Sequence, residues 1–388
     1  MADIKALDKQ YVANTYNRFP VEIVSGKGSL VYDETGKEYI DMGSGIAVTG
    51  FGVADEHWQQ AVAAQMSKVQ HMSNLFYTEP CARLAQLLCE KTGLKKVFFG
   101  NSGAEANECA IKVARKYAAE KKGPEYNVIV TLEQSFHGRT LATLAATGQD
   151  VFHKLFQPLP AGFVHTPAND FEKMAETCKN NKVAGILIEC VQGEGGVVAL
   201  DGEFIRKTAE FAKENDIVFM VDEVQTGNGR TGKLYSYMHH DVQPDVVTTA
   251  KGLGGGLPIG ACLIGEKVEH VLGYSDHGST FGGNPVCCAG AISIIERLTD
   301  ELLAEVTQKA EYIKAELAGA PGVLSLSGQG LMIGIETAKP AAEVLAACRE
   351  MGVLCLTAKT KVRLLPALNI PMDVLKKAIG VLKAACAQ

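Results

Sequence analysis

The central half of the chain alternates short apolar runs with stretches of helical spacing. Six runs have the length and composition of buried strands: 95–100 (KKVFFG), 126–133 (YNVIVTLE), 183–191 (VAGILIECV), 217–223 (IVFMVDE), 245–252 (DVVTTAKG) and 260–265 (GACLIG). Helical stretches follow at 104–121 and 204–215. The first of them gathers on one face Ala106, Ala110, Val113, Ala114 and Tyr117. This alternation predicts an α/β fold with a mostly parallel sheet and crossover helices.

The two ends of the chain follow a different pattern. A long helical stretch at about 285–318 precedes the runs VLSLSG, LMIGIE, VLCLT and VRLLP, with a further helix at 341–351. The segment SGKGSLVYDETGKEYIDM near the N-terminus reads as short strands with a hairpin tip at 34–36. We expect both ends to pack together as one smaller, discontinuous α+β domain. The predicted boundaries are 45–285 for the large domain, and 1–44 with 286–388 for the small one.

Composition narrows the classes of protein to consider. A length of 388 residues suggests two domains, and 47% hydrophobic residues suffice for a large core. The net charge of -6 argues against a general nucleic-acid binder, although it leaves a local basic patch open. The first ten residues, MADIKALDKQ, lack the apolar stretch of a secretory signal, and no run approaches the ~20 apolar residues of a membrane span.

Cysteine and histidine usage gives no sign of a disulfide framework or of a metal site. The 11 cysteines include no C-x-x-C, and the nine histidines include no H-E-x-x-H. Reduced thiols in a cytoplasmic protein are the expected state.

The most informative pairing in the sequence is that of Lys251 with Asp222. Lys251 stands in TTAKGLGGGLPIGA, and Asp222 ends the apolar run IVFMV 29 positions upstream. A lone lysine is usually a solvated surface residue, but surface lysines rarely lie between an apolar strand and a glycine cluster. A Schiff-base lysine needs such a setting, and a pyridine cofactor needs a carboxylate at its ring nitrogen. The pair therefore predicts pyridoxal phosphate chemistry at the end of the sheet.

Each of the other motifs allows a functional and a purely structural interpretation, and no single motif decides between the two. The stretch 101–104 (NSGA) opens a helix and forms either an anion site or a plain helix start. In SFHGRT, Phe136 could stack on a ring and Arg139 could grip a carboxylate, but a core Phe and a surface Arg explain them as well. Ser279 and Thr280 in HGSTFGGNP suit either a phosphate or a turn.

Buried charge adds a further constraint. Glu189 and Glu194 lie at the end of the apolar strand in ILIECVQGEGGV, where carboxylates either serve a site or cap a loop. Arg363 lies inside the apolar run VRLLPAL, and a buried arginine must find an anion, either an internal glutamate or a ligand carboxylate.

Two glycine patterns suggest nucleotide binding and fail on inspection. Gly227 is followed after four residues by Gly232-Lys233, but Leu234 then stands where a P-loop requires Ser or Thr. The pair Gly328 and Gly330 precedes another strand rather than a helix, so a dinucleotide fingerprint fails.

Six motifs in order resemble those of the class III, or ornithine-type, aminotransferases of pyridoxal phosphate fold type I. They are NSGAEA, FHGRT, IECVQGEGG, VDEVQTGNGRTG, AKGLGGGLPIGA and GSTFGGNP, and the similarity runs from YNRFPVEIVSGKG to VRLLPALNI. The resemblance implies a mostly parallel seven-stranded sheet in the large domain, with helices on both faces, and a homodimer. One departure is FGVADEHW at 51–58, where the family usually has a G-H-x-H-P-like turn, so the shape of that loop stays open.

The resemblance also implies roles at the cofactor. Lys251 matches the Schiff-base lysine and proton shuttle, Asp222 the partner of the pyridine nitrogen, and Gln225 the residue near the ring hydroxyl. Phe136 matches the ring-stacking aromatic, and Thr280 the phosphate ligand lent by the second subunit. The phosphate cradle is matched by Ser102, Gly103 and Ala104.

The implied substrate residues form a second group. Arg139 and Arg363 match the two carboxylate-binding arginines, and Glu194 matches the acid that can mask Arg363. Tyr16 matches a tyrosine at the substrate carboxylate, and Ser279 lies beside Thr280 near the substrate.

Within the family the chain is most similar to the acetylornithine-type members. The implied reaction moves the terminal amino group of N2-acetylornithine to 2-oxoglutarate, giving N-acetylglutamate 5-semialdehyde and glutamate in arginine synthesis. Ile46, where free-ornithine enzymes carry tyrosine, favours an acylated substrate, although enzymes using 4-aminobutyrate share it. The alternatives are transfer from ornithine, 4-aminobutyrate or succinylated diamines, and an aminomutase on the same fold. Outside this class stand a nucleotide-binding protein and a cofactor-free binding module.

Overall fold

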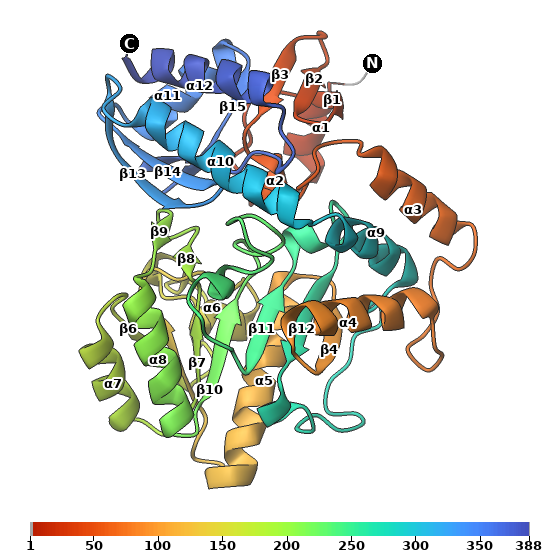
Figure 1. Ribbon diagram of the computed structural model, residues 1–388, viewed down its shortest axis with the longest axis vertical. Coiled ribbons are helices and arrows are strands. Elements are labelled where there is room, and N and C mark those ends of the chain that lie inside the picture. The colour runs from red at the N-terminus through yellow and green to blue at the C-terminus, as the bar shows by residue number, and fades with distance from the viewer. Residues whose placement is uncertain (1–2, 388) are drawn as a thin grey trace.

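A computed structural model describes residues 3–387 and contains a seven-stranded sheet at its centre (Figure 1). The strand order is β4 (Lys96–Gly100), β12 (Gly260–Ile264), β11 (Val246–Thr249), β10 (Val218–Asp222), β7 (Val183–Ile188), β5 (Val128–Leu132) and β6 (Phe163–Thr166). Pairing is parallel from β11 to β6, and only β12 runs antiparallel to its neighbours within this sheet. The mostly parallel sheet predicted from the sequence is confirmed.

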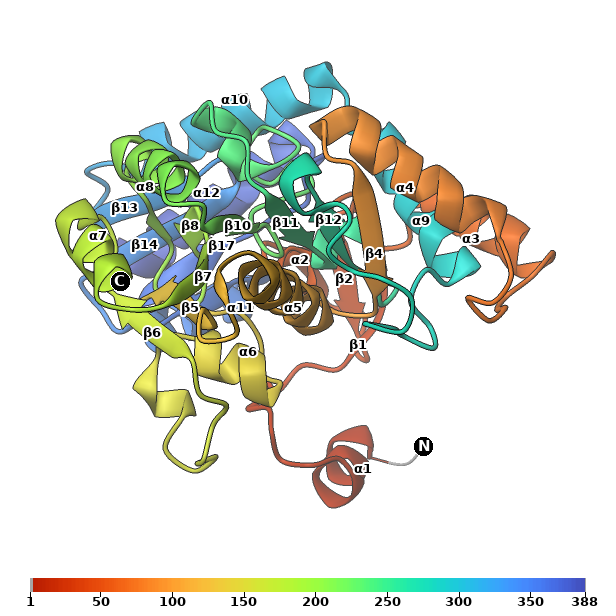
Figure 2. The ribbon, with the colours of Figure 1, turned by 90° about the horizontal axis from the view of Figure 1, so that it is seen from below.

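Helices cover both faces of this sheet, and the strand residues alternate between them (Figure 2). On one face, α5 (Gly103–Lys122) packs over Ile129 and Met220 in one buried cluster. On the other face, α7 (Phe171–Lys179) and α8 (Gly202–Glu214) share a second cluster with Val221. Strands buried on both sides explain why their sequences read as continuous apolar runs.

Two smaller sheets lie above the seven-stranded sheet in the view of Figure 1. One is antiparallel, with β13 (Val323–Gln329), β14 (Met332–Thr337), β17 (Lys361–Leu364) and β16 (Leu356–Ala358). The other joins β1 (Ile23–Lys27), β2 (Leu30–Asp33) and β3 (Glu38–Asp41) to β15 (Val353–Leu354) of the tail. The β3–β15 pairing links the two chain ends as expected, while the exact domain boundaries remain a prediction.

The helices of this upper part are α10 (Asp300–Leu317), α11 (Ala341–Glu350) and α12 (Met372–Ala387). The single helix predicted at 285–318 is wrong, because the structure has α9 (Pro285–Glu296) and a separate α10. The hydroxyl of Thr299 accepts a hydrogen bond from the N–H of Leu302 at 3.3 Å and so caps the start of α10.

An ion pair holds the loop at 51–58, whose shape the sequence left open. Asp55 caps α3 (Glu56–Met66) and receives two bonds from the Arg297 guanidinium, at 3.0 and 2.6 Å. This arrangement gives the loop a fixed shape and ties it to the end of α9.

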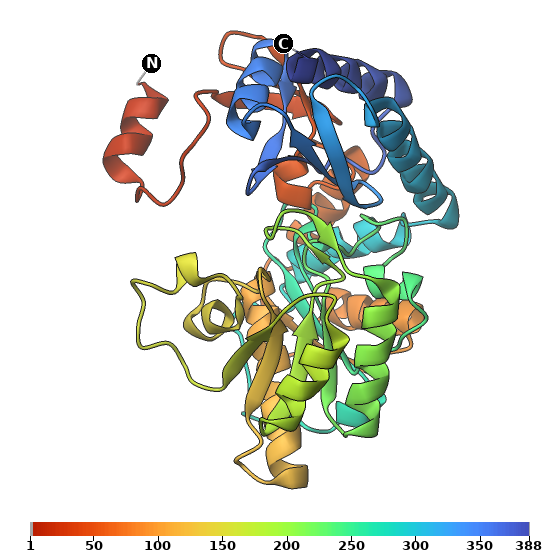
Figure 3. The same ribbon diagram turned by 90° about the vertical axis from the view of Figure 1, so that its left-hand side faces the viewer.

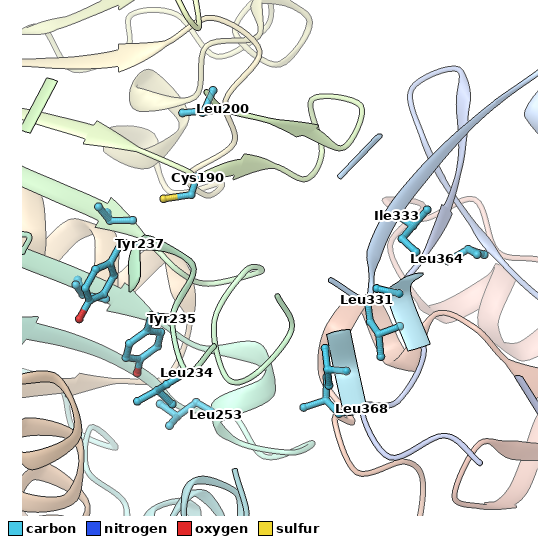
Figure 4. Packing of buried hydrophobic residues seen from close by; sticks show 14 of the residues in the cluster. Cys190, Leu200, Leu234, Tyr235, Tyr237, Leu253, Leu331, Ile333, Leu364 and Leu368 are labelled. Carbon is cyan, nitrogen blue, oxygen red and sulfur yellow. The ribbon is translucent and has the colours of Figure 1, made fainter. Parts of the chain in front are cut away.

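One buried cluster runs through the large sheet and the C-terminal sheet, so the two are packed against each other. Figure 4 labels Leu234, Tyr235 and Leu253 of the large-sheet part at the left, and Leu331 and Leu364 of the C-terminal part at the right. Leu364 neighbours Arg363 on β17, so this packing fixes the strand that carries the arginine.

The N-terminal helix α1 (Ile4–Tyr11) stands apart from the body and buries none of its residues (Figures 2 and 3). Among residues 3–387, no helix combines the length and apolar character needed to cross a membrane.

Candidate active site

A cavity of about 390 Å³ opens at the carboxyl ends of the parallel strands. The loops after β4, β5, β7, β10 and β11 line it, which is where open α/β sheets place their ligands. Its walls include Ser102, Gly103, Ala104, Asn107, Phe136, His137, Glu189, Asp222, Gln225 and Lys251. Seven of the predicted site residues therefore meet in one cavity.

Lys251 follows β11 directly and begins a short 3-10 turn, Lys251–Leu253. Its backbone has a φ of +45°, a strained conformation for a residue other than glycine. Burial lowers the pKa of the Lys251 amine, while Glu194 and Asp222 oppose that shift. A lowered pKa increases the neutral, nucleophilic fraction of the amine, as covalent catalysis requires.

Asp222 is the last residue of β10 and is only 3% exposed. Its Oδ2 accepts hydrogen bonds from His137 Nδ1 and Asn107 Nδ2, both at 2.8 Å, and its Oδ1 accepts from the N–H of Val224 at 3.0 Å. Asn107 is itself held by the Thr248 hydroxyl, which donates to Asn107 Oδ1 at 2.7 Å. These donors fix the orientation of a buried carboxylate that borders the cavity.

Asn107, His137 and Thr248 are site residues that were not predicted from the sequence. Asn107 lies one turn after Gly103 on the same helix face, and His137 sits inside FHGRT, so helical spacing and motif position were the available signals. Thr248 gave no signal of its own, because its partner comes from an element 141 positions away.

The start of α5 combines both interpretations given to NSGA. Ser102 is the N-cap, since its hydroxyl accepts from the N–H of Glu105 at 3.2 Å and donates to the Glu105 carboxylate at 2.9 Å. Within residues 3–387, nothing accepts from the N–H groups of Gly103 and Ala104, so these remain the donors available to an anion. A Cβ on Gly103 would come 2.7 Å from Val224, so only glycine fits there.

Phe136 and Glu189 connect two loops of the cavity. The N–H of Phe136 donates to Glu189 Oε2 at 2.9 Å, and the N–H of Gly193 lies 3.4 Å from Glu189 Oε1. Glu189 is 6% exposed, and burial raises its pKa to about 7. Glu189 thus anchors the backbone beside the aromatic ring and the turn that carries Glu194.

Arg363 and Glu194 form an ion pair at the border of this site. Arg363 Nη1 lies 2.6 Å from Glu194 Oε1, and the guanidinium is nearly fully buried. Although burial alone would raise the pKa of Glu194, the attraction of Arg363 lowers it below its usual range. Gln225 bridges the pair, because its Oε1 accepts from Arg363 at 3.1 Å and its Nε2 donates to Glu194 at 3.2 Å.

Four predicted residues, Tyr16, Arg139, Ser279 and Thr280, do not line the Lys251 cavity of the same chain. Tyr16 is 74% exposed, and Thr280 is exposed on a separate groove of about 740 Å³. The Ser279 hydroxyl is used within the chain, since it accepts from Asn101 Nδ2 at 3.0 Å and from the N–H of Gly282 at 2.9 Å. Arg139 is exposed beside Phe136, at 5.4 Å from its guanidinium carbon to the ring centre.

The near P-loop does not form a phosphate-binding loop. Lys233 is exposed, Leu234 is packed into the core, and a 3-10 turn at Ser236–His239 follows in place of a helix. The nucleotide-binding alternative loses its structural basis.

Comparison with known proteins adds an independent line of support. The model of the family described as "Aminotransferase class-III" matches residues 11–386. The acetylornithine aminotransferase of Haemophilus ducreyi is 49% identical over 381 residues, covering 98% of this chain and 97% of that protein. That of Methanothermobacter thermautotrophicus is 43% identical over 386 residues, with coverage of 98% and 97%.

Solved structures agree with the sequence relatives. The ornithine aminotransferase of Toxoplasma gondii, described with partial occupancy of PLP at its active site, gives a TM-score of 0.94 at 30% identity, covering 99% of this chain and 94% of that one. The N-acetylornithine aminotransferase of Stenotrophomonas maltophilia gives 0.86 at 33% identity, with 98% of both chains covered. The resemblance seen in the sequence is thereby confirmed, and the chain belongs to the class-III aminotransferase family, whose members depend on pyridoxal phosphate.

Proposed function

We propose that this aminotransferase moves the terminal amino group of N2-acetylornithine to 2-oxoglutarate, giving N-acetylglutamate 5-semialdehyde and glutamate in arginine synthesis. The observation that carries the proposal is the meeting of Lys251, Asp222 and the free N–H groups of Gly103 and Ala104 in one cavity. The names of the relatives, acetylornithine aminotransferases at 49% and 43% identity, support the choice of substrate.

The cavity residues suit pyridoxal phosphate. A buried carboxylate at Asp222 matches a ring nitrogen that must stay protonated, and Phe136 offers an aromatic face beside it. The N–H groups of Gly103 and Ala104 at the first turn of α5, which border the cavity without an acceptor of their own, would hold the phosphate. Bound pyridoxal phosphate supplies an aldehyde that takes up the substrate's amino group and a ring that accepts the electrons released when a proton leaves the substrate carbon.

The remaining steps belong to side chains of this protein. Lys251 Nζ holds the cofactor covalently before substrate arrives, and afterwards takes the proton from the substrate carbon that carries the reacting nitrogen. Hydrogen bonds from His137 and Asn107 hold the Asp222 carboxylate in the orientation that it needs as partner of the ring nitrogen. Gln225, whose amide contacts Glu194 and Arg363, would be the residue that holds the ring hydroxyl.

Two arginines allow one site to bind the carboxylates of two unlike substrates. The amino donor brings its terminal amine to the cofactor, so its carboxylate lies far from the reacting carbon, and we assign that carboxylate to Arg139. 2-Oxoglutarate also has a carboxylate next to its keto carbon, and we assign that one to Arg363. Glu194 neutralises Arg363 while the donor is bound and releases it for 2-oxoglutarate.

We infer that the active unit is a homodimer. Thr280 is exposed on a groove of its own chain, away from Lys251, and Phe281 beside it is 59% exposed. Both features suit a loop that reaches the cavity of a second copy and lends the Thr280 hydroxyl to the phosphate. Tyr16, on the exposed N-terminal arm, could contact a substrate carboxylate only if that arm is held against the cavity of the assembled dimer.

The proposed partners are small molecules rather than nucleic acid or membrane, in keeping with the net charge of -6. We also propose a cytoplasmic location. All 11 cysteines of the chain are free thiols in the structure, which supports a reducing compartment.

The test is a comparison of amino donors at equal concentration. Steady-state rates with 2-oxoglutarate as acceptor should be highest for N2-acetylornithine, and lower for ornithine, 4-aminobutyrate and succinylated diamines. A higher rate with one of these would replace the proposed substrate, and isomerisation of an amino compound without any oxoacid would indicate an aminomutase. The purified protein should be yellow, and added ATP should not raise its melting temperature.

A further inference from the structure

The guanidinium of Arg139 lies in the corner between two aromatic rings. Its central carbon is 5.4 Å from the centre of the Phe136 ring and 4.7 Å from the centre of the Phe152 ring. The two rings meet edge to face, with their centres 6.0 Å apart and their planes at 76°. Cation–π attraction to both faces therefore holds the flat cation against two walls.

The hydrogen-bonding edges of this guanidinium remain available. Within residues 3–387, no carboxylate or carbonyl forms an ion pair or hydrogen bond with Arg139. Contact with an aromatic face occupies the plane of a guanidinium but not its N–H donors, which lie along its rim. An arginine held in this way is ready to bind a planar carboxylate through two parallel hydrogen bonds.

Phe152 is fastened more firmly than the residues around it. Its N–H donates to the carbonyl of Gln149 at 3.0 Å, and the Gln149 side chain donates to the carbonyl of Ser135 at 3.0 Å. On its other side, His153 Nε2 lies 2.7 Å from the carbonyl of Thr147. Phe152 is therefore fixed between two anchors on the loop that precedes Phe136 and on the end of α6 (Leu141–Ala146).

The apolar residues near Phe152 in the chain are mostly exposed. Val151 is 69% exposed and Leu155 is 91% exposed, whereas the Phe152 side chain turns inward to Phe136 and Arg139. The ring instead lies against Arg139, the residue assigned to the substrate carboxylate, so general packing alone is a poor explanation for its position.

We propose that Phe152 is a positioning residue, which with Phe136 aims the Arg139 guanidinium at the substrate carboxylate distant from the reacting carbon. The inference rests on the proposed function for the identity of that carboxylate. It deepens that function by naming a determinant of selectivity for substrates that carry a carboxylate at this distance. Phe152 is not among the residues that line the Lys251 cavity, so its effect should pass through Arg139 alone.

The first test measures binding without turnover. Glutarate, a five-carbon dicarboxylate with no group to react, would be titrated into the cofactor-loaded protein by calorimetry. We expect Phe152→Leu to weaken glutarate binding roughly three- to tenfold, because the cation–π contact is lost while apolar volume is kept. Phe152→Tyr, which retains the ring, should bind within about twofold of the unaltered protein, and Val151→Ala in the same turn should bind unchanged. Unchanged glutarate affinity in Phe152→Leu would overturn the proposal.

The second test asks whether the effect passes through Arg139. In a double-mutant cycle with Arg139→Gln, adding Phe152→Leu should weaken glutarate binding no further, whereas an additive loss would contradict a role through Arg139. In steady state, Phe152→Leu should raise the KM for 2-oxoglutarate and leave kcat nearly unchanged, with the same cofactor absorbance. Glutarate binding does not depend on turnover. If the protein failed to use N2-acetylornithine, the proposed substrate would be refuted, but the glutarate titrations would still test the role of Phe152.

Discussion

Arg363 on β17 and Glu194 in the turn after β8 (Val191–Gln192) form an ion pair of 2.6 Å that joins the C-terminal sheet to the cavity of the large sheet. The arginine is 3% exposed, while about a third of the Glu194 side chain reaches solvent. The acid also lies in a glycine-flanked turn, QGEGG, so Glu194 is the partner better able to move. The pair can therefore open by rotation of the acid while the arginine stays in place.

The first prediction separates the two half-reactions. Arg363→Ala should slow the 2-oxoglutarate half-reaction roughly 10²-fold and the N2-acetylornithine half-reaction less than about tenfold, since the bidentate ion pair serves the oxoacid alone. Single-turnover kinetics on each half would measure both. The exposed Arg206, replaced by Ala, is the matched control and should change neither rate. Equal losses in both halves would show that Arg363 is structural or serves both substrates alike.

The sequence predicted the sheet and its site because strand ends in a parallel sheet meet at one edge. Lys251 and Asp222 end neighbouring strands, and β10 pairs with β11 through Asp222 and Thr248. The burial of Arg363 indicated that it needs an anion, and the family resemblance named Glu194, 169 positions away, as its partner. In contrast, the bonds that Asn107 makes to Asp222 and to Thr248 depend on which helix face covers the sheet, and one strand sequence does not specify that.

Two other features were out of reach for different physical reasons. The break between α9 and α10 depends on a cap at Thr299, and an uninterrupted helical spacing from 285 onward masked that signal. Thr280 and Tyr16 lie away from the cavity of their own chain, and in the proposed homodimer their roles depend on a second chain. Hydrophobic periodicity within one chain carries no information about it.

The second prediction concerns Lys251. Lys251→Ala should lose covalently held cofactor and reduce turnover by roughly 10³-fold or more, because attachment and proton transfer both use the amine. Absorbance after gel filtration would report the cofactor, and steady-state rates would report turnover. Lys233→Ala is a suitable control, since Lys233 is an exposed lysine in another glycine-rich stretch. If Lys251→Ala kept an unaltered turnover rate, Lys251 could not be the residue that binds the cofactor and transfers the proton.

The third prediction concerns the phosphate ligand lent by a second copy. Thr280→Ala should weaken cofactor binding by about 1–3 kcal/mol, the range for a hydrogen bond to a charged group, and Thr280→Ser should restore most of it. Equilibrium dialysis of the cofactor would measure the change, and sedimentation would report the oligomer. A monomer that retains full activity would contradict both the role of Thr280 and the homodimer.

The last prediction follows from the buried carboxyl of Glu189. Burial raises its pKa from 4.5 to about 7, so between these values the folded protein binds a proton that the unfolded chain has released. Unfolding then releases that proton, and stability falls as pH rises through this window, whereas below pH 4.5 Glu189 is protonated in both states and costs nothing. The loss is complete above about pH 7 and is on the order of 3 kcal/mol.

Glu189→Gln resembles the protonated form at every pH and should remove this dependence. The unfolding free energy of the variant, relative to the unaltered protein, should therefore rise between pH 5 and pH 8, by up to about 3 kcal/mol. Denaturant melts at four or five pH values would measure the difference, with Glu210→Gln on the exposed face of α8 as the control that should stay flat. A constant difference between Glu189→Gln and the unaltered protein across the window would mean that Glu189 titrates normally, and that its bonds to Phe136 and Gly193 keep it ionised.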